Sequence, residues 1–240
     1  MQDHHLSTYA AGLDTAGFTI IPDVFSAAAV DAMLTTIAGA DQTGPNFRRT
    51  ADLFAIRSFL QEVPAIAALV FSPALQQIVR QLLGEDYFLV KSIYFDKPGD
   101  SNWLVAWHQD LTISVAAKLP VPGYDRWSVK QEQYAVQPPA DILESNYTIR
   151  IHLDDTDEQN GALKVLPGTH RKGIYRADSI DFGATPEVCC AVKKGGVMMM
   201  RPLLMHASGR SSNGHNRRVI HLEFSNRTLA GGLQWAERPA

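Results

Sequence analysis

From about residue 86 onward, the sequence alternates short runs of β-forming residues with turns rich in glycine, proline, asparagine and aspartate. The runs are YFLVKSIYF, TIRIHL, ALKVL, VMMM and RVIHLEF. Several short strands without helices between them are typical of a sandwich or barrel and not of a parallel α/β sheet. The sequence therefore predicts a mainly β fold, with a β core over about residues 86–228.

The N-terminal part, residues 1–85, has a more helical pattern. A brief apolar run, FTII, stops at a proline, and Ser26 then stands in position to cap a helix that buries Val30, Leu34 and Ile37. Ser72, followed by proline, gives a second N-cap, and its helix is expected to end near a glycine about twelve residues on. We expect these helices to form an outer layer on the β core.

Size and charge limit the function. The chain has 240 residues, of which 45% are hydrophobic, which is enough for one domain with one substantial core. The formal net charge is −3, so the basic excess that binds nucleic acid or an anionic membrane is missing. The expected partner is a small molecule, and the sequence predicts no oligomeric state.

The two cysteines, Cys189 and Cys190, are adjacent and cannot form a disulfide framework between distant segments. The first residues, MQDHHLSTYAAGLDTAG, lack the basic and apolar regions of a secretory signal, and no run of about 18 apolar residues occurs. A cytoplasmic, soluble protein is the expectation.

One segment, Lys118–Leu143, departs from the strand pattern. It contains four prolines, a glycine and several aromatic residues, and a loop of this length in a compact domain is usually either disordered or functional. We interpret it as an ordered lid that recognises substrate through Tyr124, Arg126, Trp127 and Tyr134. The alternative is a solvated surface excursion.

Three short motifs could supply metal ligands. Fe(II) that must also bind a chelating cosubstrate and O2 needs three protein ligands on one face, and two imidazoles with one carboxylate supply them. A His-x-Asp/Glu motif places two such ligands on the same side of a strand. Three pairs fit this pattern: His108 with Asp110, His152 with Asp154, and His221 with Glu223.

The surroundings favour the first pair. His108 follows Trp103 and Trp107, which supply an apolar wall, and the segment after it becomes loop-like, as an open site at a barrel mouth requires. His221 lies deep in an apolar strand, where a core role or a role beside the site is expected. His152 lies in mid-strand and is expected to be an inward-facing polar residue that contacts substrate.

The third ligand is expected late in the chain. His206 ends an apolar run and precedes a glycine- and serine-rich turn, which leads to a last strand that begins with Arg217 and Arg218. A guanidinium beside the metal would bind the distal carboxylate of 2-oxoglutarate through two parallel hydrogen bonds. The alternative is that both arginines are exposed to solvent at the start of the strand.

Three segments carry a resemblance to a known family: WHQDLT, RIHLDDTDEQNGALKVLPGTH and MHASGRSSNGHNRRVIHLEFS. Together they resemble the phytanoyl-CoA dioxygenase family of Fe(II)- and 2-oxoglutarate-dependent oxygenases over about residues 86–226, and the N-terminal GFTIIPDVFS is also similar. The resemblance implies a double-stranded β-helix, or jelly roll, with the metal at its open end.

The resemblance also implies roles for single residues. By position, the iron ligands are His108, Asp110 and His206. Arg217 matches the arginine that holds the distal carboxylate of 2-oxoglutarate, and Ser208 matches a hydroxyl that contacts the same group. Arg150 falls where relatives place a contact to cosubstrate or substrate. His170 is expected to be structural or to support the residues that bind the metal.

The implied reaction uses O2 and 2-oxoglutarate, releases succinate and CO2, and hydroxylates an unactivated C–H bond. The sequence departs from the enzymes that act on phytanoyl-CoA, since Lys118–Leu143 is longer than their loop and no basic channel for coenzyme A phosphates is evident. Halogenation is disfavoured because halogenases of this type replace the carboxylate ligand with a small residue. The alternatives are a cupin-like protein that does not use 2-oxoglutarate and a binding module without catalysis.

Overall fold

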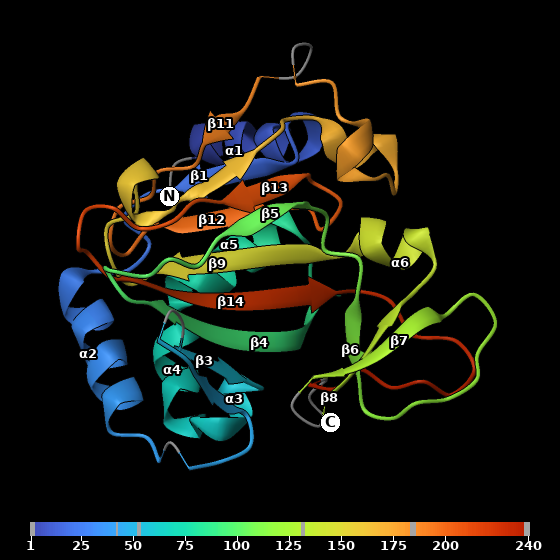
Figure 1. Ribbon diagram of the computed structural model, residues 1–240, viewed down its shortest axis with the longest axis horizontal. Helices are drawn as coiled ribbons and strands as arrows, with labels where there is room; N and C mark the ends of the chain where they lie inside the picture. The colour runs from blue at the N-terminus through green and yellow to red at the C-terminus, as the bar shows by residue number, and fades with distance from the viewer. Residues whose placement is uncertain (1–2, 42, 52–53, 131–132, 183–185, 238–240) are drawn as a thin grey trace.

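The computed structural model describes residues 3–41, 43–51, 54–130, 133–182 and 186–237. Two antiparallel sheets form the body of the molecule, helices cover the outer face of the larger sheet, and a third, small sheet lies at the side (Figure 1). This is the expected jelly roll with flanking N-terminal helices. The prediction of a mainly β fold is confirmed.

In the described residues the larger sheet has seven strands, and four of them are the predicted runs YFLVKSIYF, TIRIHL, VMMM and RVIHLEF. In spatial order the strands are β1 (Phe18–Ile21), β12 (Val197–Met200), β9 (Tyr147–His152), β14 (Arg217–Ser225), β4 (Phe88–Lys97), β3 (Phe54–Arg57) and β2 (Phe47–Arg49). Strand β14 lies in the middle, paired with β9 on one side and β4 on the other.

The facing sheet has four strands within the part of the chain that is described: β11 (Val188–Cys189), β10 (Leu163–Val165), β13 (His206–Ser208) and β5 (Val105–His108). At the β1 and β12 end, apolar side chains such as Val165, Met198 and Met200 fill the space between the two sheets. The other end of this space holds polar side chains from β4, β9 and β14.

The helices begin where the sequence predicts. Ser26 caps α2 by accepting a hydrogen bond from the backbone of Ala29, and Ser72 caps α5 with a proline at the first helical position. The helices are α1 (Asp3–Thr15), α2 (Ala27–Ala38), α3 (Phe59–Glu62), α4 (Ala67–Val70), α5 (Pro73–Leu82) and α6 (Ala140–Ser145), with short 3-10 turns at Pro64–Ile66, Glu158–Asn160, Thr169–Lys172 and Ala177–Ser179. No helix among the described residues has the length and apolar character that crossing a bilayer requires.

The N-terminal part is more than an outer layer. Val30, Met33 and Ile78 of the helices pack on the outward-facing side chains of β9 and β14, as expected for such a layer. The same part of the chain also adds strands to both edges of the large sheet, with β1 next to β12 and β3 next to β4.

The segment Lys118–Leu143 is not the irregular loop that its prolines suggested. It contains β7 (Asp125–Lys130) and β8 (Gln133–Gln137), which form a small sheet with β6 (Ile113–Val115), and it ends inside α6. The prolines stand before β7 and after β8, so they leave the strand hydrogen bonds intact. Residues 131–132 of the segment lie outside the described residues.

Tyr124, predicted to contact substrate, lies in a second apolar core. Its side chain is 5% exposed and packs with Val136, Leu233 and Trp235, while its hydroxyl accepts a hydrogen bond from the backbone of Ala230. A side chain enclosed in this way stabilises the small sheet. Trp127 and Tyr134 are partly buried against the same core, and Arg126 is exposed.

This difference predicts unequal effects of two nearby substitutions. Tyr124→Ala removes a large buried ring and should lower the free energy of unfolding by about 3 kcal/mol. Arg126→Ala removes an exposed side chain and should change it by less than about 0.5 kcal/mol. Chemical denaturation measures both values, and equal effects would contradict the placement of Tyr124 in a core.

Candidate functional site

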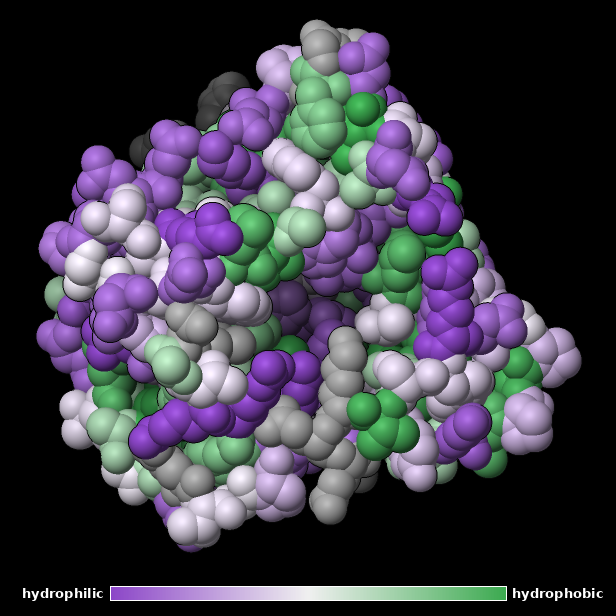
Figure 2. All heavy atoms as spheres, viewed as in Figure 1, coloured by the Kyte–Doolittle hydropathy of each residue, from purple (hydrophilic) through white to green (hydrophobic). Residues whose placement is uncertain are grey.

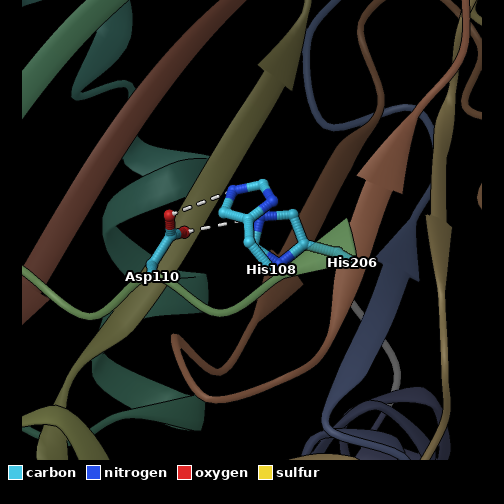
Figure 3. Close-up of side chains that lie close together, drawn as sticks. All are labelled: His108, Asp110 and His206. Atoms are coloured by element: carbon cyan, nitrogen blue, oxygen red, sulfur yellow. Dashed lines mark ion pairs between the residues drawn. The ribbon is translucent and has the colours of Figure 1, made fainter. Parts of the chain in front are cut away.

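Three side chains converge where β5 and β13 lie side by side (Figure 3). His108 and His206 are paired across these strands, and Asp110 follows β5 in a segment without regular structure. Asp110 Oδ1 lies 3.8 Å from His108 Nε2, and its Oδ2 lies 3.7 Å from His206 Nε2. All three ligand atoms lie within 4.8 Å of one another, a spacing that one metal ion can bridge.

Backbone hydrogen bonds prepare both imidazoles for a metal. Nδ1 of His108 lies 2.8 Å from the carbonyl oxygen of Ala106, and Nδ1 of His206 lies 2.8 Å from that of Leu204. A carbonyl oxygen only accepts, so each Nδ1 carries the proton and each Nε2 has a free lone pair. Both Nε2 atoms face Asp110, which is the arrangement that a metal ligand set requires.

The ionisation states also fit a divalent metal. Burial lowers the pKa of His206 to about 4, although the nearby Asp110 carboxylate opposes this shift, so the imidazole is neutral at pH 7. Burial alone would raise the pKa of Asp110, but the surrounding imidazoles of His206, His221 and His108 and the Lys91 ammonium hold it at about 2. At pH 7 the site therefore offers a neutral imidazole nitrogen on His206 and a carboxylate on Asp110.

The other two His-x-Asp/Glu pairs are engaged elsewhere. Asp154 accepts hydrogen bonds from the Arg218 side chain at 2.8 and 2.6 Å, and His152 Nδ1 lies 2.7 Å from the hydroxyl of Thr156. His221 Nε2 lies 3.0 Å from its own partner, Glu223. Within the described ranges, the group around Asp110 is the one cluster of three or more His, Cys, Asp or Glu side chains that could hold a metal.

Arg217 and Ser208, two of the residues predicted to bind cosubstrate, are buried. Arg217 is 4% exposed and Ser208 is 2% exposed, and Ser208 lies on the same face of β13 as His206. Arg217 Nε and Ser208 Oγ are both buried without a hydrogen-bond partner among the described residues. Buried polar atoms normally have a hydrogen-bond partner, so these two atoms indicate a place where a polar ligand could bind.

Arg150 adds a second buried cation. It is 8% exposed, and its Nε also has no partner among the residues described. Burial and the positive charge of Arg150 lower the pKa of Arg217 to about 9, and burial lowers the pKa of Arg150 to about 10 despite the charge of Asp110. Both groups remain charged at pH 7, so their burial without carboxylate partners favours an anionic ligand.

A network of polar side chains, which the sequence did not predict, lies on the inward face of the large sheet together with Arg150. Lys91 Nζ lies 2.7 Å from Glu223, His221 Nε2 contacts the same carboxylate oxygen at 3.0 Å, and His221 Nδ1 lies 3.2 Å from Arg150. His221 thus belongs to this network, in agreement with the role beside the site that its strand suggested. The sequence feature that could have indicated this network is Glu223, a charged residue at an inward-facing position of a largely apolar strand.

His170 lies away from the metal ligands. Its Nε2 is 3.1 Å from the carbonyl oxygen of Asp14, and its ring packs against Gly17, at the join between α1 and β1. Gly17 has a φ of +86°, and a Cβ there would meet the ring at 2.4 Å. These contacts agree with the structural role expected for His170.

The comparison with known proteins agrees with this geometry. The sequence pattern of the phytanoyl-CoA dioxygenase (PhyH) family matches residues 13–219, most of the chain. The chain belongs to this family. The predicted membership is confirmed, and the match extends over α2 to α5 as well as the β core up to the start of β14.

The names of similar proteins refer to different compounds. Over 130 residues the chain is 31% identical to a probable alpha-ketoglutarate-dependent hypophosphite dioxygenase of Stutzerimonas stutzeri, covering 54% of this chain and 35% of that protein. Over 166 residues it is 26% identical to an ectoine dioxygenase of Bordetella bronchiseptica, covering 66% of this chain and 47% of that protein. The chain thus spans half or less of the length of these relatives.

Solved structures share the fold. An ectoine dioxygenase structure, EctD from S. alaskensis in its apoform, matches with a TM-score of 0.71 and 21% identity over 100% of this chain and 82% of that one. HygX from Streptomyces hygroscopicus, with nickel, 2-oxoglutarate and hygromycin B bound, matches with a TM-score of 0.66 and 18% identity over 94% and 87% of the two chains. At these identities the matches support the jelly-roll fold and not a substrate.

The geometry predicts which histidine is needed for metal binding. His108→Ala should abolish binding of Mn(II), because it removes one of three ligands, whereas His152→Ala should retain most of it, because His152 contacts Thr156 instead. Equilibrium dialysis with Mn(II) measures both. Loss of binding in His152→Ala alone would move the metal site to β9.

Proposed function

We propose that this protein is an Fe(II)- and 2-oxoglutarate-dependent oxygenase that hydroxylates a small molecule. Two groups of buried side chains from the two facing sheets support the proposal. One is the three-ligand cluster around Asp110, next to β5 and β13 of the smaller sheet. The other is Ser208 on β13 and Arg217 on β14 of the larger sheet, whose Oγ and Nε atoms are buried and have no hydrogen-bond partner among the described residues. A metal site alone would suit many cupin-like proteins, but a buried arginine without a carboxylate needs an anionic ligand.

Each group has a defined task in this proposal. His108, Asp110 and His206 would hold Fe(II) from one side, and bound iron supplies O2 activation coupled to conversion of 2-oxoglutarate into succinate and CO2. Arg217 and Ser208 would bind the distal carboxylate of 2-oxoglutarate and so orient the cosubstrate. The surrounding burial keeps water away from these polar groups.

The charges support a dianionic cosubstrate. Besides burial, the charge of Arg150 lowers the pKa of Arg217, so the two guanidinium groups lie near each other. The 2-oxoglutarate dianion would bring one carboxylate to the metal and the other to these guanidinium groups. His152 is proposed to line this end as well. Its Nε2 is buried and has no hydrogen-bond partner among the described residues, and burial together with the charges of Arg150 and Arg217 lowers its pKa.

The substrate is proposed to enter beside the small sheet. Figure 2 shows a hollow between the body and this sheet, with hydrophilic residues deep inside it. The small sheet follows directly after the Asp110 segment, and Gln133 of β8 donates a hydrogen bond to Ser58 of the body. We propose that Arg126, Trp127 and Tyr134 contact the substrate there, and that Tyr124 supports them from the core.

The first test is turnover of the cosubstrate. Purified protein with Fe(II), O2 and 2-oxoglutarate should release succinate slowly, and a panel of small metabolites should reveal compounds that accelerate it. The metabolite classes named for the relatives, ectoine and hypophosphite, belong in the panel. Absence of both succinate release and 2-oxoglutarate binding by calorimetry would refute the proposal.

Two adjacent arginines give a sharper prediction. Arg217→Ala should weaken 2-oxoglutarate binding by at least about 10-fold, because a charge-assisted hydrogen bond contributes roughly 1.5–3 kcal/mol. Arg218 faces the other side of β14 and binds Asp154, so Arg218→Ala should leave most of the affinity for 2-oxoglutarate. Calorimetry on the metal-loaded variants measures both. Similar losses in the two variants would show that the inward-facing residue has been misassigned.

A further inference from the structure

Gln109 stands between two proposed metal ligands, and its side chain has no part in the proposed chemistry. Unlike His108 and Asp110, it points away from the site, as alternation along an extended segment requires. The residue is 6% exposed, and its side-chain NH2 group donates two hydrogen bonds. Nε2 donates to the carbonyl oxygens of Leu203 at 2.7 Å and Gly173 at 2.9 Å.

These partners belong to two segments behind the metal site. Leu203 lies in the turn between β12 and β13, three residues before His206. Gly173 lies at the start of the connection that leads to β11. Tyr175 of the same connection donates its backbone N–H to Gln109 Oε1 at 3.1 Å. One buried side chain thus joins the His108–Asp110 segment to the turn that leads into β13, on which His206 lies.

The ligand that most needs such support is Asp110. His108 and His206 lie on paired strands, so the sheet itself fixes their separation. Asp110 lies outside every strand, and its backbone N–H makes one bond to this turn, to the carbonyl oxygen of Pro202 at 2.9 Å. The Gln109 amide is the second connection between the same segment and the same turn.

We infer that Gln109 is a positioning residue for the metal site, which holds the Asp110 carboxylate at the distance from the two imidazoles that Fe(II) requires. The inference rests on the proposed function, because it assumes that these three side chains bind metal. Removal of the Gln109 amide would leave the bond from the Asp110 backbone to Pro202 to hold the segment on the turn, and it would take a donor away from the carbonyl oxygens of Leu203 and Gly173. Groups that orient metal ligands typically contribute about 10- to 100-fold to metal affinity.

Two substitutions separate positioning from electrostatics. Gln109→Glu keeps the length of the side chain but loses both N–H donors and adds a negative charge near the metal. Charge alone would make the variant bind Mn(II) more tightly, whereas loss of positioning makes it bind more weakly. Gln109→Met removes the hydrogen bonds without a charge, and it serves as the second variant if Gln109→Glu does not fold.

Gln76, an exposed glutamine, supplies a control away from the metal. Its Nε2 also donates to a backbone carbonyl, that of Phe71 at 2.7 Å, but it lies on α5, in the helical layer on the outer face of the large sheet. Gln76→Glu and Gln76→Met therefore remove a similar bond away from the metal. Thermal unfolding in the presence of a chelator gives the stability of each metal-free variant, so that metal affinity is compared between folded proteins.

The experiment measures Mn(II) affinity by dialysis and the electron paramagnetic resonance spectrum of bound Mn(II). We expect both Gln109 variants to bind Mn(II) at least about 10-fold more weakly than wild type and to show an altered spectrum, while the Gln76 variants match wild type in both. Unchanged affinity and spectrum in a folded Gln109 variant would overturn the inference. Failure of the wild type itself to bind Mn(II) would instead refute the proposed function.

Discussion

The pairing of β14 with β4 and β9 decides which side chains face the inside of the jelly roll. Ile220, Leu222 and Phe224 face the helices and join the main apolar core, while the alternate residues face the interior. A shift of β14 by one residue would turn its apolar side chains into the polar interior and its charged ones into the core. The main core and the candidate site therefore depend on the same register.

The two ends of β14 show how this register is held. At its start, Arg218 binds Asp154 of the segment after β9 through its side chain and its backbone N–H, which directs the neighbouring Arg217 inward. Arg217 finds no carboxylate there among the described residues, so its burial is unfavourable until an anion binds. Binding of a cosubstrate would then stabilise the folded protein as well as complete the site.

The strands also determine where most of the proposed metal ligands lie. Two of the three ligands lie on neighbouring strands of the smaller sheet, and their ring nitrogens are fixed by backbone carbonyl groups two residues earlier. The carboxylate depends on contacts with a turn instead of a strand. The site is therefore most sensitive at Asp110, where few backbone bonds set the position of the ligand.

Much of this arrangement could be predicted from the sequence because it depends on local patterns. The β runs and the caps at Ser26 and Ser72 follow from alternation, proline positions and side-chain hydrogen bonding. The choice of His108 over His152 followed from neighbouring residues and from a family resemblance. The placement of Arg217 on the inward face followed from the same resemblance and from strand alternation.

The rest depends on contacts between distant parts of the chain, which local patterns do not contain. Prolines suggested an irregular loop at Lys118–Leu143, but they flank two strands whose side chains pack on a C-terminal segment that includes Trp235. The bond between Gln109 and Leu203 joins residues 94 positions apart, and Lys91 meets Glu223 across 132 positions. Only the folded structure brings these pairs together.

The most direct test is a crystal structure grown without oxygen in the presence of Fe(II) and 2-oxoglutarate. We predict one iron bound by His108 Nε2, Asp110 and His206 Nε2, with the distal carboxylate of 2-oxoglutarate against Arg217 and Ser208. An iron at His152 and Asp154, or a cosubstrate carboxylate that leaves Arg217 unpaired, would contradict it.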